Sequence, residues 1–225
     1  MLHIERMVWI FVGGVGCSSG DTGGKDDTLR ERLTEPTTGM DLMRIEASSF
    51  DIGCASAHSE DGCADGPPVT RVTLTHDYYL GQTEVTQAQH RALGLSNPSV
   101  SPDCGDACPV EGLSWNHAAA FANALSEAGG HQACYACTGA ETDPVCVVPS
   151  SPYDCDGYRM PTEAEWEGAA RCGHDNAYAG GDAPHGYSWG DGNSEGAKHE
   201  VRQLHANDCQ LYDMSGNVWE WTHDL

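Results

Sequence analysis

Eleven cysteines are the residues of this chain with the greatest capacity for chemistry. Four of them lie in one short stretch that begins with a C-x-x-C pair: Cys134, Cys137, Cys146 and Cys155. Four thiolates at such spacing could bind a structural zinc ion, or they could form two disulfides in an oxidising compartment. So many cysteines are unusual in a protein of the reducing cytosol. We therefore favour two disulfides in this stretch over a zinc site.

The other cysteines also form close pairs along the chain, apart from Cys17 near the N-terminus. These pairs are Cys54 with Cys63, Cys104 with Cys108, and Cys172 with Cys209. Setting Cys17 aside leaves an even number, as expected for a set of disulfides. We predict local pairing for the first two pairs, and spacing alone leaves the remaining connectivity open.

Two further groups of residues, four histidines and three glutamates, are weaker indications of a functional site. Four histidines are scattered through a glycine-rich region and are expected at the surface rather than on a metal: His174, His185, His199 and His205. Glu163, Glu165 and Glu167 lie at the start of a predicted helix, where the helix dipole favours acidic side chains, so we interpret them as capping residues. The sequence contains no phosphate-binding loop, G-x-S-x-G or H-E-x-x-H motif.

The charge of the chain limits its partners. A net charge of -23 over 225 residues argues against nucleic acid and against anionic membrane surfaces, because both would repel it. A soluble acidic surface is the simplest interpretation, and bound divalent cations are a second way to neutralise carboxylates. The length suits one domain, and the 27 glycines and 11 prolines indicate many loops and turns.

The N-terminus is similar to a bacterial lipoprotein signal over residues 1–17. Residues 7–15 are apolar, follow Arg6, and are too few to span a bilayer as a helix. Cleavage would leave Cys17 as the lipidated residue, so membrane contact is expected only through this anchor. Plain secretion and a misassigned start are the alternatives, because Gly14 replaces the usual leucine. Residues 18–41 are polar and are predicted to be a disordered tether.

The folded domain is expected over residues 42–225, with short strands and three helices. Residues 43–53, 69–74 and 78–80 show strand patterns. Helix starts are predicted at Thr86 with Gln89, at Ser114, and at Thr162 with Glu165, where the first and third are capping boxes. The second helix should end at Gly129-Gly130. Residues 132–155 have few apolar side chains and are predicted to be a disulfide-stapled insertion.

Several segments, in order, closely resemble the formylglycine-generating enzyme (sulfatase-modifying factor) family. The two most specific are G-Y-R-M-P-T-E-A-E-W-E at 157–167 and L-Y-D-M-S-G-N-V-W-E-W at 211–221. Weaker matches lie at 50–53, 67–74, 81–86, 109–115 and 187–191. The resemblance implies an irregular α+β fold, C-type-lectin-like and disulfide-rich, with little regular secondary structure. Five tryptophans should stabilise its core: Trp115, Trp166, Trp189, Trp219 and Trp221.

The family's enzymes oxidise a sulfatase cysteine to formylglycine with oxygen and copper, and two cysteines beyond an R-G-G-S-W element hold the copper. This sequence contains no such element, so we assign no catalytic residue and expect no copper in this chain. Two functional classes follow: a longer copper oxidase, or a non-catalytic module on a lipoprotein that binds a protein or peptide. A sulfoxide-synthase relative is discounted, because the first forty residues could not encode its iron-binding helical domain.

The resemblance also implies calcium at the 211–221 turn, with Asp213, Gly216, Val218 and Glu220 as ligands. Calcium takes six to eight oxygens, and two carboxylates with two turn carbonyls suit that preference. The alternative is that Asp213 and Glu220 accept hydrogen bonds from loop amides. A second family calcium site would begin at Asn193 and Ser194, although residues 195–206 offer no clear partner for them.

Overall fold

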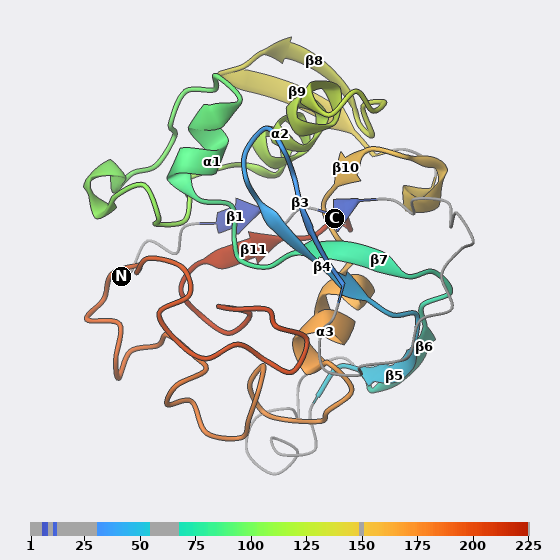
Figure 1. Ribbon diagram of the computed structural model, residues 1–225, viewed down its shortest axis with the longest axis vertical. Helices are drawn as coiled ribbons and strands as arrows, with labels where there is room; N and C mark the ends of the chain where they lie inside the picture. The colour runs from blue at the N-terminus through green and yellow to red at the C-terminus, as the bar shows by residue number, and fades with distance from the viewer. Residues whose placement is uncertain (1–5, 9–10, 13–30, 55–67, 149–150, 225) are drawn as a thin grey trace.

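A five-stranded sheet forms the centre of the computed structural model, which describes residues 6–8, 11–12, 31–54, 68–148 and 151–224. Its strands follow the order β10, β2, β7, β4 and β3, and every neighbouring pair is antiparallel. These strands are β10 (Tyr158–Arg159), β2 (Phe11–Val12), β7 (Tyr78–Gly81), β4 (Asp41–Ile45) and β3 (Arg32–Thr34). Figure 1 shows β4 and β7 across the middle of the molecule, between the α2 and α3 helices.

Three two-stranded sheets surround this centre. β5 (Ser49–Ile52) pairs with β6 (Thr70–Thr73), and β8 (Ala136–Ala140) pairs with β9 (Asp143–Val147), both antiparallel. β11 (Trp219–Trp221) runs parallel to β1 (Arg6–Val8). Between α3 and β11 the chain has no named helix or strand, and it forms the large loops at the lower left of Figure 1. The predicted α+β fold with little regular structure is confirmed.

Local sequence signals start all three α-helices. α1 (Gln87–Ala92) and α3 (Glu163–Arg171) begin at the predicted capping boxes of Thr86 and Thr162. α2 (Trp115–Ala128) begins at Ser114, whose hydroxyl accepts a hydrogen bond from the amide of His117. Short 3-10 turns cover Pro102–Cys104 and Pro152–Asp154. No helix in the described ranges has the length and apolar character to cross a membrane.

The two faces of the central sheet pack against different helices. Along β4, Leu42 points into a core that contains Phe121 and Leu125 of α2. Its neighbour Met43 points the other way, into a core that contains Ala169 of α3. This alternation is the period of two that a strand with both faces buried must have. The sheet therefore holds the α2 and α3 sides of the molecule together.

Four disulfides lie within the described residues. Cys104–Cys108 confirms one predicted local pair, and Cys172–Cys209 joins two cysteines that are 37 positions apart. The cysteine-rich stretch forms two nested bridges, Cys134–Cys155 and Cys137–Cys146, with the inner one across the β8–β9 pair. Because these sulfurs are bonded to one another, none is available for zinc. Cys54 is also disulfide-bonded, while Cys63 and Cys17 lie outside the described residues.

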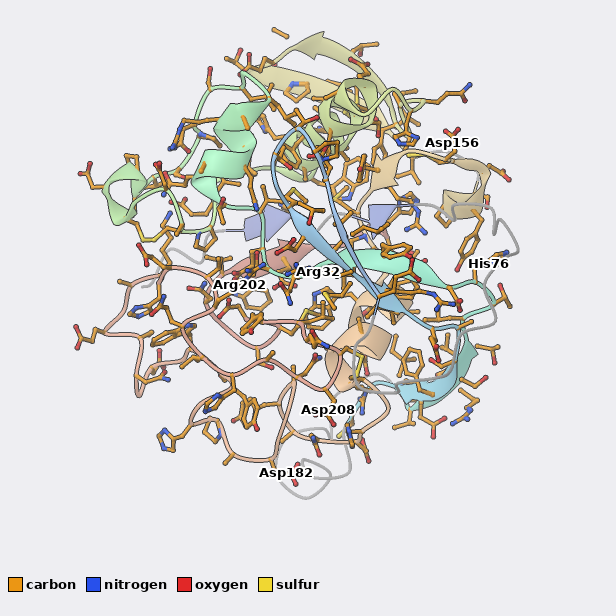
Figure 2. The ribbon with its side chains drawn as sticks, in the orientation of Figure 1. Arg32, His76, Asp156, Asp182, Arg202 and Asp208 are labelled. Atoms are coloured by element: carbon orange, nitrogen blue, oxygen red, sulfur yellow. A yellow bond between two sulfur atoms is a disulfide. The ribbon has the colours of Figure 1, made fainter. Side chains whose placement is uncertain are left out.

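The folded domain starts earlier than predicted. β3 pairs with β4, and Glu35 is 1% exposed because both its carboxylate oxygens accept hydrogen bonds from amides of the turn that follows. The prediction of a disordered tether is therefore wrong for residues 31–41, and residues 18–30 lie outside the described part. Asp41 also binds Arg32 at 3.6 Å and Arg202 at 3.2 Å, and Figure 2 shows these two arginines close together.

Other differences concern the predicted first strand, the N-terminal leader and one tryptophan. The segment 43–53 contains two strands, β4 and β5, which belong to different sheets. The segment expected as a signal peptide contains two strands: β1 pairs with β11, and β2 pairs with β7 and β10. Cleavage of this segment stays a prediction. Trp219 is 57% exposed, so the expectation that it lies in the core is wrong.

Candidate functional site

The turn before β11 packs against two segments that are distant in sequence. The amide of Tyr212 donates to the carbonyl of Gln82 at 3.0 Å, and the side-chain amide of Gln82 donates to the carbonyl of Gln210 at 2.9 Å. On its other side, the amide of Trp189 donates to the carbonyl of Ser215 at 3.2 Å. These contacts bring the loop after β7, the loop around Trp189 and residues 211–218 into one site, which we call the acidic turn.

Gly216 allows the closest backbone approach in the acidic turn. Its φ is +92°, a left-handed conformation that side chains rarely adopt. A Cβ atom built on it would lie 1.9 Å from the carbonyl oxygen of Trp189. The glycine predicted to ligate calcium therefore also has a steric role in bringing the two loops together.

Asn217 ties the acidic turn to both neighbouring segments. Its Oδ1 accepts from the amide of His199 at 2.9 Å, and its Nδ2 donates to the carbonyl of the same residue at 3.3 Å. Nδ2 also donates to Oε2 of Glu84 at 3.4 Å. The ring of His199 stacks on Trp189 with 3.7 Å between centroids, so this histidine belongs to the site rather than to an isolated surface position.

Asp213 has one carboxylate oxygen engaged and one without a partner. The side chain is buried, and its Oδ2 accepts from the amide of Arg202 at 2.8 Å. Its Oδ1 has no hydrogen-bond partner in the described part of the chain, and neither has the nearby Nε1 of Trp189. Burial raises the pKa of Asp213, while the Arg202 amide and Trp189 act in the opposite direction. A buried carboxylate oxygen without a hydrogen-bond partner can act as a ligand to a cation.

Glu84 is a further acid of this site that sequence reasoning missed. Its side chain is 0% exposed and its Oε1 has no partner among the described residues. Burial, then the carboxylates of Asp213 and Glu220, raise the pKa of Glu84 well above its usual range. The signal was present, because Glu84 belongs to the Glu-Val-Thr element that precedes α1, but nothing in the sequence placed that element beside Asp213.

Glu220 lies in β11 at the edge of the same acidic environment. Its carboxylate accepts a hydrogen bond from the indole Nε1 of Trp166, which ties α3 to the strand. Across the described residues, no three His, Cys, Asp or Glu side chains converge closely enough to bind a metal ion by themselves. Calcium here would therefore need the backbone carbonyls of Gly216 and Val218, as the predicted ligand set has it.

The second predicted calcium position has its oxygens in use. Oδ1 of Asn193 accepts from the amide of Gly190 at 2.8 Å, and the carbonyl of Ser194 lies 3.0 Å from Nε2 of His199. These bonds close the turn that follows Trp189. The structure thus gives Asn193 and Ser194 a turn-forming role, and calcium binding by them stays a prediction.

The remaining histidines do not converge on the acidic turn. His174 pairs with the exposed Asp208 at 2.7 Å, and the ring of His205 lies 5.8 Å from that of Tyr187. His185 is exposed. Of the predicted site residues, the structure therefore places Asp213 and Gly216 together with Glu84, Asn217 and Trp189, and leaves these three histidines apart.

Comparison with known proteins finds relatives of two kinds. Residues 29–225 match the family described as sulfatase-modifying factor enzyme 1-like domain. Chaperone protein LppX of Paenibacillus barcinonensis is 30% identical over an alignment 213 residues long, which covers 82% of this chain and 71% of that protein. The formylglycine-generating enzyme of Mycobacterium tuberculosis is 44% identical over an alignment 80 residues long, which covers 29% of this chain and 27% of that enzyme.

One solved structure resembles this chain over about as much of its length as the chaperone protein LppX does. Treponema denticola variable protein 1 superposes with a TM-score of 0.68 at 30% identity. The superposition covers 86% of this chain and 76% of that protein. The likeness to the chaperone and to the variable protein therefore extends over most of the chain, whereas the likeness to the enzyme is confined to a short part.

Proposed function

Since this chain belongs to the family of sulfatase-modifying factor enzyme 1-like domains, we propose that it is a non-catalytic binding module of chaperone type that works in an oxidising compartment. The observation that carries the proposal is the 30% identity to a chaperone protein along 82% of the chain. The same fold can host different functions, so the extent of this match matters more than the shared scaffold.

The cysteine chemistry supports both parts of the proposal. All nine cysteines within the described ranges are disulfide-bonded. Disulfides persist in secreted and extracytoplasmic proteins, which supports export and agrees with the lipoprotein-like leader. Copper held by cysteines needs thiolates, and none of these nine offers one.

A copper oxidase is the second candidate function, and the 44% identity to a formylglycine-generating enzyme over 80 residues favours it. That identity covers 27% of the enzyme, so it concerns part of the scaffold. Incubation of the purified protein with copper, oxygen, a thiol reductant that supplies the two further electrons and keeps the peptide reduced, and a sulfatase-type cysteine peptide separates the two candidates. We expect the peptide's mass to stay unchanged, whereas conversion of its cysteine to formylglycine would favour the oxidase.

The β8–β9 hairpin is the surface we propose for polypeptide binding. Val145 and Val147 point outward from β9 and are 56% and 63% exposed. The Cys137–Cys146 bridge ties the two strands, so these side chains are displayed on a constrained ribbon. Extended polypeptides bind to such strands through the backbone and through apolar side chains on one face.

The chaperone proposal predicts that the whole oxidised protein suppresses aggregation of a thermally unfolded probe, citrate synthase, measured by light scattering. Suppression should rise with protein concentration and weaken in the V145S/V147S double variant, because the apolar contact is lost. Val69→Ser is the control, since Val69 is also 56% exposed but directly precedes β6, which Figure 1 shows far from the β8–β9 hairpin. Aggregation equal to that with an inert protein such as serum albumin would rule out chaperone activity.

We also propose that calcium neutralises the acidic turn. Asp213 and Glu84 are both buried, and each has one carboxylate oxygen without a partner among the described residues. Burying two such carboxylates lowers the stability of the fold unless they are protonated or a cation neutralises them. Asp213 and Glu220 would supply charge, while the carbonyls of Gly216 and Val218 would complete the ligand set. Calcium in this position would supply structural cohesion rather than a chemical step.

Calcium should therefore raise the melting temperature of the native protein. A ligand that binds only the folded state at 100 times its Kd stabilises that state by about 2.7 kcal/mol. Differential scanning calorimetry with and without calcium should show the rise, and the D213N/E220Q double variant should lose it. Asp191→Asn is the control, because Asp191 is exposed in the neighbouring loop. An equal rise in the double variant would remove calcium from this turn.

A further inference from the structure

The Cys137–Cys146 bridge differs from the other described disulfides in its exposure. It joins directly opposite residues of β8 and β9, and both of its cysteines are half-buried. Figure 1 shows this hairpin beside α2 at the top of the molecule. Each of the other three described bridges contains one buried cysteine, with exposures of 6% for Cys134, 0% for Cys108 and 3% for Cys209. Exposed disulfides are reduced more readily than buried ones, so this bridge is the most open of the four to a thiol in solution.

A side chain of α2 donates a hydrogen bond to one sulfur of the bridge. Nδ2 of Asn123 lies 3.3 Å from Sγ of Cys137. The same Nδ2 donates to the carbonyl of Tyr135 at 2.8 Å, and Oδ1 of Asn123 accepts from the amide of Tyr135 at 3.0 Å. These two backbone contacts fix the orientation of the carboxamide, so its N–H group faces the sulfur. A thiolate at Cys137 therefore has a hydrogen-bond donor already in place, and hydrogen bonds to a charged partner are the stronger kind.

The other sulfur of the bridge has the opposite kind of partner. The carbonyl oxygen of Asn116 lies 3.4 Å from Sγ of Cys146, where it can accept a hydrogen bond from a thiol. The partial negative charge of this oxygen disfavours a thiolate in the same place. Oδ1 of Asn116 also accepts from the amide of Cys146 at 3.1 Å, which ties β9 to α2 independently of the bridge. The surroundings therefore fit a thiolate at Cys137 and a thiol at Cys146.

We infer that Cys137–Cys146 is a reversible redox site whose reaction partner is a small thiol. A thiolate from solution attacks Sγ of Cys146, and the electron pair of the broken S–S bond leaves on Cys137, where Asn123 stabilises it. A second thiolate attacks the small-molecule sulfur of this mixed disulfide and departs with it as a disulfide. The released sulfur of Cys146 takes one proton and donates it to Asn116. Two small thiols have then lost two electrons to the bridge, and one proton stays in solution; a small disulfide closes the bridge by the reverse steps.

Opening the bridge also regulates the β8–β9 surface, a consequence that rests on the proposed polypeptide-binding function. Cys146 packs toward α2, while its neighbours Val145 and Val147 are exposed on the opposite face of β9. The closed bridge holds the two strands together, so the valines are displayed without further ordering. With the bridge open, polypeptide binding must also restrain the strands, which costs conformational entropy. Reduction therefore weakens polypeptide binding, and oxidation restores it.

The first test follows the bridges without any client polypeptide. The whole oxidised protein is equilibrated at graded ratios of reduced to oxidised dithiothreitol, its thiols are alkylated, and mass spectrometry measures each cysteine. Cys137 and Cys146 should be half reduced at a ratio at least about tenfold lower than the other three described bridges require, which corresponds to about 30 mV. Reduction of any of those three at the same or a lower ratio, or opening of all bridges in one step, would overturn the inference.

Asn123→Asp tests the separate roles of the two sulfurs. The aspartate keeps an oxygen that accepts from Tyr135 but puts a second oxygen in place of the donor to Cys137. In the selectively reduced protein, Cys137 should react with iodoacetamide at a lower pH than Cys146, and the variant should remove this difference. Glu127→Gln, at an exposed position of α2, is the control and should keep it. The same order of reaction in Asn123→Asp, or Cys146 reacting at the lower pH in the unaltered protein, would contradict the assigned roles.

The citrate synthase assay then measures the regulation. Selective reduction should raise the protein concentration needed for equal suppression of aggregation about two- to tenfold, and reoxidation with glutathione disulfide should reverse the change. The C137S/C146S double variant should behave as the reduced protein does. Equal suppression by the oxidised and reduced forms would overturn the regulation. Absence of suppression by the oxidised protein would contradict the proposed function and the regulation that rests on it, whereas the dithiothreitol titration decides the redox site by itself.

Discussion

Replacing Glu165 by alanine should destabilise the protein by about 3–5 kcal/mol, the usual cost of removing one partner from a buried ion pair. The carboxylate of Glu165 binds Arg159 through two hydrogen bonds of 2.8 Å, and the side chains of these two residues are 2% and 0% exposed. The same carboxylate accepts from the amide of Thr162 and so closes the capping box of α3. The variant therefore leaves a charged guanidinium in the core and removes the carboxylate half of the capping box, so that the amide of Thr162 loses its acceptor.

Urea denaturation of both proteins measures this loss. Typical domains are stable by only about 5–15 kcal/mol, so a large shift of the midpoint is expected. Glu163→Ala in the same first turn of the helix is exposed and should change stability by at most about 1 kcal/mol. Adding Arg159→Met to the Glu165 variant should restore part of the loss, because no uncompensated charge then remains. A midpoint for Glu165→Ala equal to that of the control would contradict the structural account of this pair.

Replacing Gly216 by alanine should cost about 2–4 kcal/mol through backbone strain and steric conflict. The φ of +92° disfavours any side chain, and the new Cβ would meet the carbonyl oxygen of Trp189 at 1.9 Å. Because that oxygen belongs to the backbone, no side-chain rotation can relieve the contact. The two loops of the acidic turn must separate, so the effect of calcium on the melting temperature should weaken as well.

Gly192→Ala is the matched control for this substitution. Gly192 lies in the neighbouring loop, has no positive φ, and has open space around the position of a Cβ. Its stability should stay within about 0.5 kcal/mol of the unaltered protein. Thermal unfolding of both variants, with and without calcium, gives the comparison. Equal melting temperatures for the two variants would show that the loops can separate without cost.

Local signals were enough to predict the helix starts. The capping boxes at Thr86 and Thr162 depend on residues three positions apart, and the structure contains both. The close cysteine pair Cys104–Cys108 is local in the same sense. The nested order of Cys134–Cys155 and Cys137–Cys146 could not be predicted, because it depends on how the β8–β9 hairpin folds.

The start of the domain was misjudged for a physical reason. Residues 31–41 are polar and have no long apolar run, so their composition resembles a tether. Glu35 is buried because amides of its own turn satisfy its carboxylate, and β3 gains its hydrogen bonds from β4. Burial of a polar segment through such contacts leaves no hydrophobic pattern in the sequence.

The sequence by itself determined the family, the α+β character and the oxidised state of the cysteines, and it pointed to Asp213 and Glu220 as the acids of the candidate calcium site. These inferences depend on residue types and short spacings. Only the tertiary structure decided that Glu84 lies beside Asp213 and that Gly216 admits the Trp189 carbonyl. Each of these depends on contacts between segments far apart in the chain. Burial and electrostatic coupling arise from such contacts, and no local pattern encodes them.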